Sequence, residues 1–262
     1  MDKKFKQYLE DYFVRVEKIY GEVPKHCYET QVILGKNPED AYASGADLQH
    51  NIIYLNPDDP DLEWTLYHEM EHIRTAHSIN KTMASGVYLE TVDNEKGAIG
   101  IALTEAMTEI SVETLLNRNQ EKIGYYEIIQ LTRQIAILMN LDDLGLLNYY
   151  NKNGIVDLTI LCAKLTGDST IFLSLVICLD ELEESHDDDL DYEFSTYGKI
   201  KNKLGSFPSE KTKDLRFKFN LLKNKLFDKI KESKCYNKAT LREISNKYKS
   251  LSPYEEESVV KL

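Results

Sequence analysis

Cysteine is scarce in this chain of 262 residues, and its few cysteines lie far apart. No two of the four form a C-x-x-C pair; they are Cys27, Cys162, Cys178 and Cys235. Disulfide frameworks and cysteine metal sites need dense or paired cysteines instead. We therefore expect four free thiols in a reducing compartment, which favours a cytoplasmic protein.

Long apolar runs are missing as well. No stretch reaches the roughly 18–20 apolar residues that cross a bilayer as a helix. The N-terminus leads into the amphipathic stretch Gln7–Tyr20, and not into the apolar core of a secretory signal. With 42% hydrophobic and 29% charged residues, the composition is that of a globular protein with a core. The sequence thus predicts one large domain or two small ones, in the cytoplasm and without a membrane partner.

Basic residues are few in residues 1–198, which carry a net charge of −21, whereas residues 199–262 carry +9. A basic segment can bind nucleic acid. However, the chain has neither zinc-finger spacing nor an aromatic–glycine nucleic-acid signature. We expect the basic segment to pack against the acidic body, with nucleic-acid binding as the less favoured alternative. No feature of the sequence indicates an oligomeric state, and no internal repeat is present.

One stretch indicates a metal site. It is His68-Glu69-Met70-Glu71-His72, which contains the pattern His-Glu-x-x-His. On a helix, residues four apart project from the same face, so His68 and His72 would lie side by side. Two neutral imidazole nitrogens so placed can bind one zinc ion. Glu69, next to the first of them, can take a proton from a zinc-bound water. The pattern requires a third ligand elsewhere in the chain.

The surrounding sequence predicts a rigid scaffold for this pattern. Thr30–Leu34 and Asn51–Asn56 are strand candidates, the second apolar on both faces and so buried. A helix is expected over Asp61–Arg74, with Asp59 as its cap and Pro60 at its first position. The motif falls in the second and third turns of that helix.

Elsewhere the periodicity of apolar residues is mainly helical. Residues 40–45 look like a loop, and Val87–Val92 with Ala98–Ile101 suggests a hairpin. Asp180–Glu193 is expected to form an acidic patch or loop. We expect further helices at Lys3–Tyr20, Thr104–Asn117, Tyr125–Asn140, Leu144–Tyr150, Val156–Leu165, Thr170–Leu182, from Leu215 onward and at Leu241–Leu251.

The stretch Thr104-Glu105-Ala106-Met107-Thr108-Glu109 offers candidates for the third ligand. Glu105 and Glu109 are again four residues apart on a predicted helix and share a face. One carboxylate can complete a His₂Glu site and leave a fourth position for water. The other can accept the ring N–H of a ligating histidine, which fixes its tautomer and raises its basicity.

Together these two stretches resemble the gluzincins, the thermolysin-like zinc metallopeptidases, whose His-Glu-x-x-His is followed by a helical Asn-Glu-Ala-x-[Ser/Thr]-[Asp/Glu]. The resemblance covers about residues 45–115, with Thr104 in place of the asparagine and a longer gap after His72. By position, Glu105 resembles the third ligand and Glu109 the partner of the first motif histidine. The resemblance implies one zinc per chain and a peptide or protein substrate beside the strand Asn51–Asn56.

Several other residues near the motif have side chains that could take part in such a site. The group that stabilises an oxyanion in such peptidases is usually a tyrosine or histidine, and Tyr88, Tyr126 and Tyr150 are candidates. His77 lies nine residues after His68, so a continuous helix would turn it to the opposite side. Glu71 is expected to face solvent. Glu113 is expected to be a salt-bridge partner, with a ligand set shifted by one helical turn as the alternative.

We therefore expect an α+β fold, mostly helical, with a small β-sheet beside a zincin-like motif helix and a helical C-terminal part. Residues 1–117 would form the catalytic part, 118–198 a helical subdomain completing the cleft, and 199–262 a basic helical segment. The expected activity is zinc-dependent peptide hydrolysis with Glu69 as general base. The alternative is a catalytically silent zinc-binding regulatory or interaction protein, or a repressor-cleaving regulator of the ImmA/IrrE type.

Overall fold

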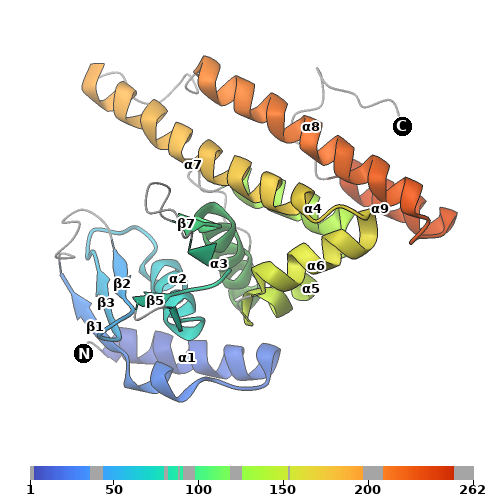
Figure 1. Cartoon of the computed structure of the whole chain (residues 1–262). Helices are drawn as coiled ribbons and strands as arrows, with labels where there is room; N and C mark the ends of the chain where they lie inside the picture. The colour runs from blue at the N-terminus through green and yellow to red at the C-terminus, as the bar shows by residue number, and fades with distance from the viewer. Residues whose placement is uncertain are drawn as a thin grey trace.

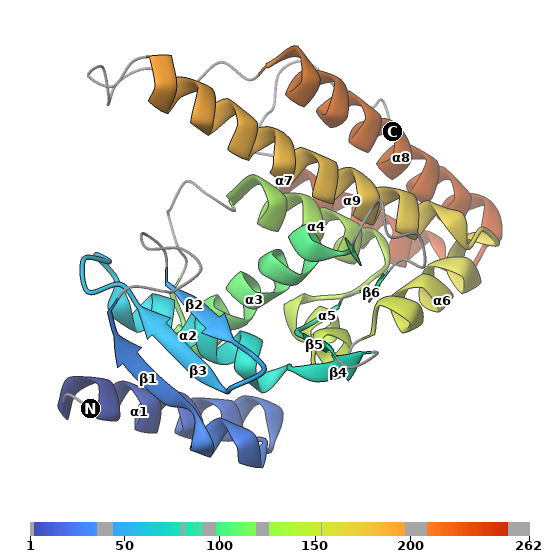
Figure 2. The ribbon, with the colours of Figure 1, turned by 60° about the vertical axis from the view of Figure 1, so that its left-hand side comes forward.

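A computed structural model of the chain shows an α+β architecture that is mostly helical, as the sequence predicts (Figure 1). The N-terminal part contains a small sheet with helices packed on it, and long helices lie beside this part (Figures 1 and 2). The structure describes residues 3–35, 44–79, 82–87, 89–90, 98–118, 126–152, 154–196 and 209–250.

The N-terminal part is built around a three-stranded sheet in the order β1-β3-β2. β1 (Gln31–Leu34) is parallel to the central strand β3 (Ile52–Leu55), and β2 (Gly45–Asp47) is antiparallel to it. β3 is only half buried, because two of its four residues are fully enclosed and two are partly exposed. Within the described residues, both edges of β3 are occupied by neighbouring strands. The expectation that a substrate lies beside Asn51–Asn56 stays a prediction. Gly45 is the first residue of β2, so the expected loop over residues 40–45 is wrong at that position.

α1 (Lys3–Tyr20) has the predicted bounds and packs with the short 3₁₀ helix η1 (Lys25–Glu29) against this part. α2 (Leu62–Arg74) follows β3 and carries the His-Glu-x-x-His motif. Its N-cap is Asp61, whose carboxylate accepts the Trp64 N–H at 3.2 Å. The expected cap at Asp59 is wrong, since that side chain instead accepts the backbone N–H of Asp61.

Two short hairpins connect α2 to the next helix. β4 (His77–Ile79) pairs with β5 (Thr82–Ala84), and β6 (Leu89–Glu90) pairs with β7 (Ala98–Ile99). The second pairing agrees with the expected hairpin, whose turn lies outside the described residues. The first pairing was not predicted.

α3 (Ile101–Leu116) lies between two hydrophobic cores. Val112 and Leu115 on one face join the core under the sheet, and Leu103 and Met107 join the core of the helical part. The helix begins three residues earlier than expected. The reason is a long-range contact: the carboxylate of Asp180 accepts the N–H groups of Gly100 and Ala102 at 2.8 and 2.9 Å.

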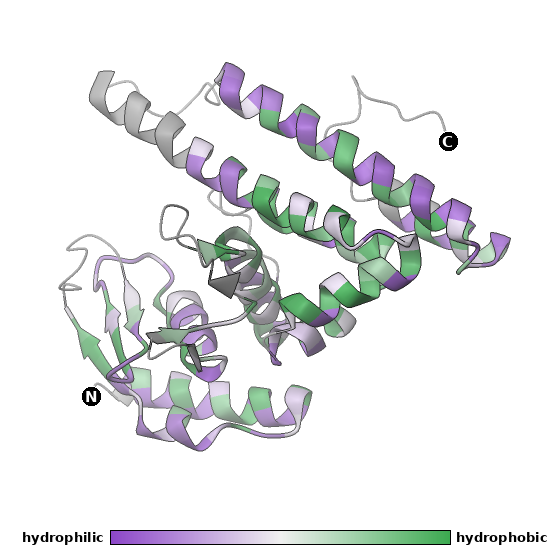
Figure 3. Ribbon diagram, viewed as in Figure 1, coloured by the Kyte–Doolittle hydropathy of each residue, from purple (hydrophilic) through white to green (hydrophobic). Residues whose placement is uncertain are grey.

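The helical part consists of α4 to α9, and the hydropathy colouring of Figure 3 shows apolar residues concentrated in α5, α6 and the first half of α7. α8 runs alongside α7 (Figures 1 and 2). The bounds are α4 (Tyr126–Leu138), α5 (Asp143–Tyr150), α6 (Ile155–Thr166), α7 (Thr170–Thr196), α8 (Glu210–Ser233) and α9 (Lys238–Ser250).

Of the two alternatives expected for Asp180–Glu193, an acidic patch or a loop, the loop is wrong, because α7 continues through this stretch to Thr196. Leu182 and Ser185 are fully buried, so the inward face of the helix persists beyond its predicted end.

The basic segment contacts the acidic body through α8. Arg216 pairs with Glu127 at 2.6 Å, Lys218 with Glu181 at 2.5 Å, and Lys225 with Asp168 at 3.3 Å. Among the described residues, no helix has the length and apolar character needed to cross a membrane. The three-part division at residues 117 and 198 stays a prediction.

Candidate metal centre

The two histidines of the motif lie side by side on the inner face of α2. Their rings meet edge to face with centroids 4.7 Å apart, and the two Nε2 atoms are 3.0 Å from each other. Both side chains are largely enclosed, with 13% of His68 and 11% of His72 exposed. The helical spacing of four residues produces this pairing, as the sequence predicts.

Glu105 reaches the same point from α3, which packs against α2. Its carboxylate oxygens lie 3.2 Å from Nε2 of His68 and 3.4 Å from Nε2 of His72. One ligand atom from each of the three residues lies within 4.8 Å of the other two. The cluster of His68, His72 and Glu105, here called the triad, can therefore hold a metal ion.

Glu109, one turn further along α3, approaches His68 from the opposite side of the ring. Its Oε1 lies 2.9 Å from Nδ1 of His68, and its Oε2 accepts the indole N–H of Trp64 at 2.8 Å. An ionised carboxylate can only accept, so Nδ1 of His68 donates its proton to Glu109. When Nε2 carries no proton, its lone pair is directed to the triad, which is the form a metal ligand requires.

The pKa shifts of the triad residues show that their arrangement favours a positive charge between them. Burial acts against protonation of His68, but hydrogen bonds with Glu105 and Glu109 hold the pKa of its imidazole well above the usual value. Burial acts against ionisation of Glu105, yet the neighbouring His72 and His68 hold the pKa of this carboxyl well below its usual value. Two imidazole nitrogens and a carboxylate this close together need a cation among them, and either a proton or a metal ion meets that need.

Glu69 lies next to His68 in sequence and is only 7% exposed. Burial raises the pKa of its carboxyl, while the nearby His68 and His72 act to lower it. Within the described part of the chain, its carboxylate makes no hydrogen bond and no ion pair. Glu69 is thus an enclosed carboxylate near the triad that is free to take up a proton.

Ser85 contributes a contact that the sequence did not reveal. Its Oγ lies 2.9 Å from Nδ1 of His72, on the side of the ring that faces away from Glu105. The residue directly follows β5 and precedes the hairpin that the sequence predicts from Val87 onward. Nothing in the spacing of Ser85 relative to the motif indicates this role.

Of the three tyrosines considered for oxyanion stabilisation, only Tyr150 has a described side chain; those of Tyr88 and Tyr126 lie outside the described residues. Tyr150 is fully buried, and its hydroxyl contacts Thr108 Oγ1 at 2.7 Å and Thr75 Oγ1 at 3.4 Å. It therefore cannot reach a substrate in this conformation.

His77, Glu113 and Glu71, which lie close to the triad residues in sequence, have other partners. His77 bonds through Nδ1 to the carbonyl of Thr75 at 3.1 Å and is not part of the triad. Glu113 pairs with Arg133 at 2.6 Å, which agrees with its expected role as a salt-bridge partner. The expectation that Glu71 faces solvent is wrong: it is fully buried and bonded to Arg74 and Tyr12.

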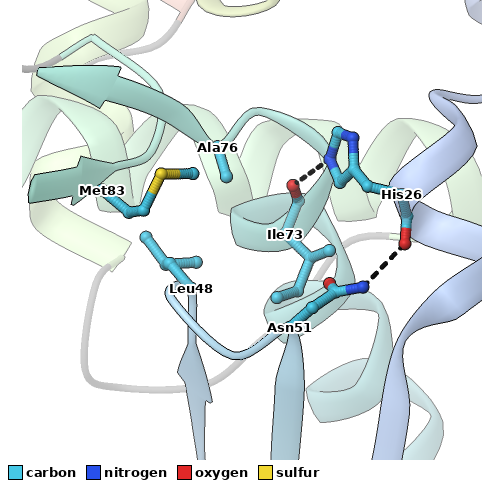
Figure 4. Close-up of a pocket in the computed structure, with 6 residues that line it drawn as sticks. All are labelled: His26, Leu48, Asn51, Ile73, Ala76 and Met83. Carbon is cyan, nitrogen blue, oxygen red and sulfur yellow. Dashed lines mark hydrogen bonds between the residues drawn. The ribbon is translucent and has the colours of Figure 1, made fainter. Parts of the chain in front are cut away.

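A pocket of about 290 Å³ opens at the C-terminal end of α2 (Figure 4). Its polar side chains are already bonded, His26 to the carbonyl of Ile73 and Asn51 to the carbonyl of His26. The other lining residues are apolar, and none of the triad residues lines it. The lining residues are His26, Leu48, Asn51, Ile73, Ala76 and Met83.

Comparison with protein-family models, curated proteins and solved structures finds no match for this chain.

Proposed function

We propose that this protein is a zinc-dependent peptidase in which His68, His72 and Glu105 hold the metal and Glu69 is the general base. The observation that carries the proposal is the convergence of two imidazoles and one carboxylate beside the enclosed carboxylate of Glu69, which has no partner among the described residues. A purely structural site needs no such base, and structural zinc sites usually have four protein ligands. The resemblance of both motif stretches to gluzincins also supports a zinc-dependent peptidase.

The donor set fits zinc. Two neutral imidazoles and one carboxylate are the ligands of many catalytic zinc sites, which keep a fourth position for water. The Nδ1 atoms of both histidines are already bonded, to Glu109 and Ser85, so their Nε2 atoms are the ones available to a metal. A zinc ion bound there supplies Lewis-acid polarisation of a water molecule and of a peptide carbonyl.

Glu69 supplies the proton transfers of hydrolysis. Its carboxylate removes a proton from the attacking water as the water oxygen bonds to the carbonyl carbon of the peptide. When the carbon–nitrogen bond breaks, the same group delivers that proton to the leaving amine. No covalent link between enzyme and substrate is required.

A comparison of Glu69→Gln with the parent protein in a peptide-library assay tests this function. The variant keeps the shape of the side chain but cannot accept a proton, so we expect full metal content and a rate at least about 100-fold lower. Glu10→Gln, on the exposed outer side of α1, is the matched control and should cleave like the parent. Equal cleavage by the parent and Glu69→Gln would exclude Glu69 as the base.

A second candidate is a zinc-binding regulatory protein without catalytic activity. The burial of Tyr150 favours it, because the one described candidate for oxyanion stabilisation points into the core. In that case the parent would bind zinc at full stoichiometry but cleave no peptide in the library.

A further inference from the structure

Each imidazole of the triad has a hydrogen-bond partner at its Nδ1 atom, but the two partners are different groups. Glu109 lies 2.9 Å from Nδ1 of His68, and the hydroxyl of Ser85 lies 2.9 Å from Nδ1 of His72. The carboxylate comes from α3, whereas Ser85 comes from the short segment that follows β5. The orientation of His72 therefore depends on how firmly that segment is fixed.

At Gly86 the segment is closely packed against neighbouring helices. Its φ of +64° lies in the left-handed region, which favours glycine. A Cβ at this position would lie 2.7 Å from Thr104 Cγ2 and 2.7 Å from Tyr150 Cε2. The backbone at Gly86 thus passes between α3 and α5 with no room for a side chain.

A buried set of hydroxyl groups holds the same segment by hydrogen bonds. The N–H of Gly86 donates to Thr75 Oγ1 at 3.1 Å, at the C-terminal end of α2. Tyr150 joins Thr75 to Thr108, which lies on α3 between Glu105 and Glu109. The three helices α2, α3 and α5 therefore all meet at the residue next to Ser85.

We propose that Ser85 is a positioning residue for His72, and that Gly86, Thr75 and Tyr150 fix the position of Ser85. By accepting the Nδ1–H of His72, the Ser85 hydroxyl selects the tautomer whose Nε2 lone pair faces Glu105. A neutral hydroxyl raises the basicity of an imidazole less than a carboxylate does. His72 is then the weaker of the two histidine ligands, and its position depends on the helical part of the protein through Tyr150.

This inference rests on the metal binding proposed above, but not on the peptidase activity. The test measures the zinc affinity of the metal-depleted full-length protein by competition with a chelator. It also records the visible absorption of the cobalt-loaded protein, which responds to ligand geometry. The variants are Ser85→Ala, which loses the hydroxyl, and Ser85→Thr, which keeps it. Ser185→Ala is the matched control, because Ser185 is a buried, hydrogen-bonded serine on α7, away from the triad.

We expect Ser85→Ala to bind zinc about tenfold more weakly and to change the cobalt spectrum, as loss of such a partner does elsewhere. Ser85→Thr should stay within about twofold of the parent, and Ser185→Ala should match it in both measurements. An unchanged affinity and an unchanged cobalt spectrum in Ser85→Ala would overturn the inference while leaving the metal site intact. Absence of zinc binding by the parent would overturn the metal site and this inference together.

Discussion

Trp64 and His68 are joined through a single carboxylate. Glu109 accepts the indole N–H of Trp64 at 2.8 Å with one oxygen and lies 2.9 Å from Nδ1 of His68 with the other. Trp64 precedes His68 by one helical turn of α2, so both contacts are made from the same face. The chain contains one tryptophan, and it lies directly behind the proposed metal centre.

Trp64 should therefore report metal binding by its fluorescence. When zinc is added to the metal-depleted protein, charge is redistributed along His68 and Glu109, and the emission of Trp64 should change until about one zinc per chain is bound. Glu105→Ala should show no such change at the same zinc concentrations. A response to zinc that is the same in the parent and in Glu105→Ala would place the metal elsewhere.

Removal of Glu71 should destabilise the protein strongly. Arg74 is 5% exposed and donates from Nε to the Glu71 carboxylate at 2.8 Å, so Glu71→Ala leaves a guanidinium buried without its carboxylate. We expect a loss of about 3–5 kcal/mol in the free energy of unfolding, measured by urea denaturation. Glu10→Ala, which removes one partner of an exposed pair, should change that free energy by less than about 0.5 kcal/mol. Similar losses in both variants would contradict the assignment of Glu71 to a buried ion pair.

Two buried tyrosines in ring contact offer a matched comparison. Tyr12 and Tyr67 are both fully buried with ring centroids 5.1 Å apart. The Tyr12 hydroxyl donates to Glu71 at 2.7 Å, whereas the Tyr67 hydroxyl has no partner among the described residues. Tyr12→Phe should cost about 1–3 kcal/mol of unfolding free energy, and Tyr67→Phe should be neutral or stabilising. Equal effects in thermal or urea unfolding would contradict this difference in bonding.

Lys223 should make the stability depend on pH in the alkaline range. It is 6% exposed, and burial lowers the pKa of its ammonium group to about 8. In the unfolded chain a lysine titrates near 10.4, so between these values the unfolded state binds more protons and stability rises with pH. Relative to Lys223→Met, the parent should gain about 2 kcal/mol from pH 7.5 to 9.5, measured by urea denaturation. A constant difference between the two proteins across that range would show that Lys223 titrates normally when folded.

Local sequence was sufficient to predict the parts of the site that lie on regular helices. The spacing of four residues fixes the relation of His68 to His72 and of Glu105 to Glu109, because an α-helix has the same geometry wherever it forms. The mostly helical α+β class was likewise evident from the periodicity of apolar residues. Both follow from the spacing of residues that are close together in the sequence.

The residues that were missed depend on contacts between distant segments. Ser85 meets His72 through a tight turn at Gly86 that only the packing of Thr104 and Tyr150 requires. Glu71 is buried because Arg74 neutralises its charge and the Tyr12 hydroxyl donates to it, although an acidic residue in a charged helix normally faces solvent. α3 begins early because Asp180, some 80 residues later, caps it. None of these partners can be identified from local spacing.

The most direct test of the proposed centre is the zinc content of the purified, metal-replete protein by mass spectrometry, alongside Glu105→Ala and His77→Ala. We predict about one zinc per chain in the parent, a sharp reduction in Glu105→Ala, and no change in His77→Ala, whose ring contacts the Thr75 carbonyl instead. Full zinc content in Glu105→Ala, or no zinc in the parent, would contradict the ligand set and remove the basis for a zinc peptidase.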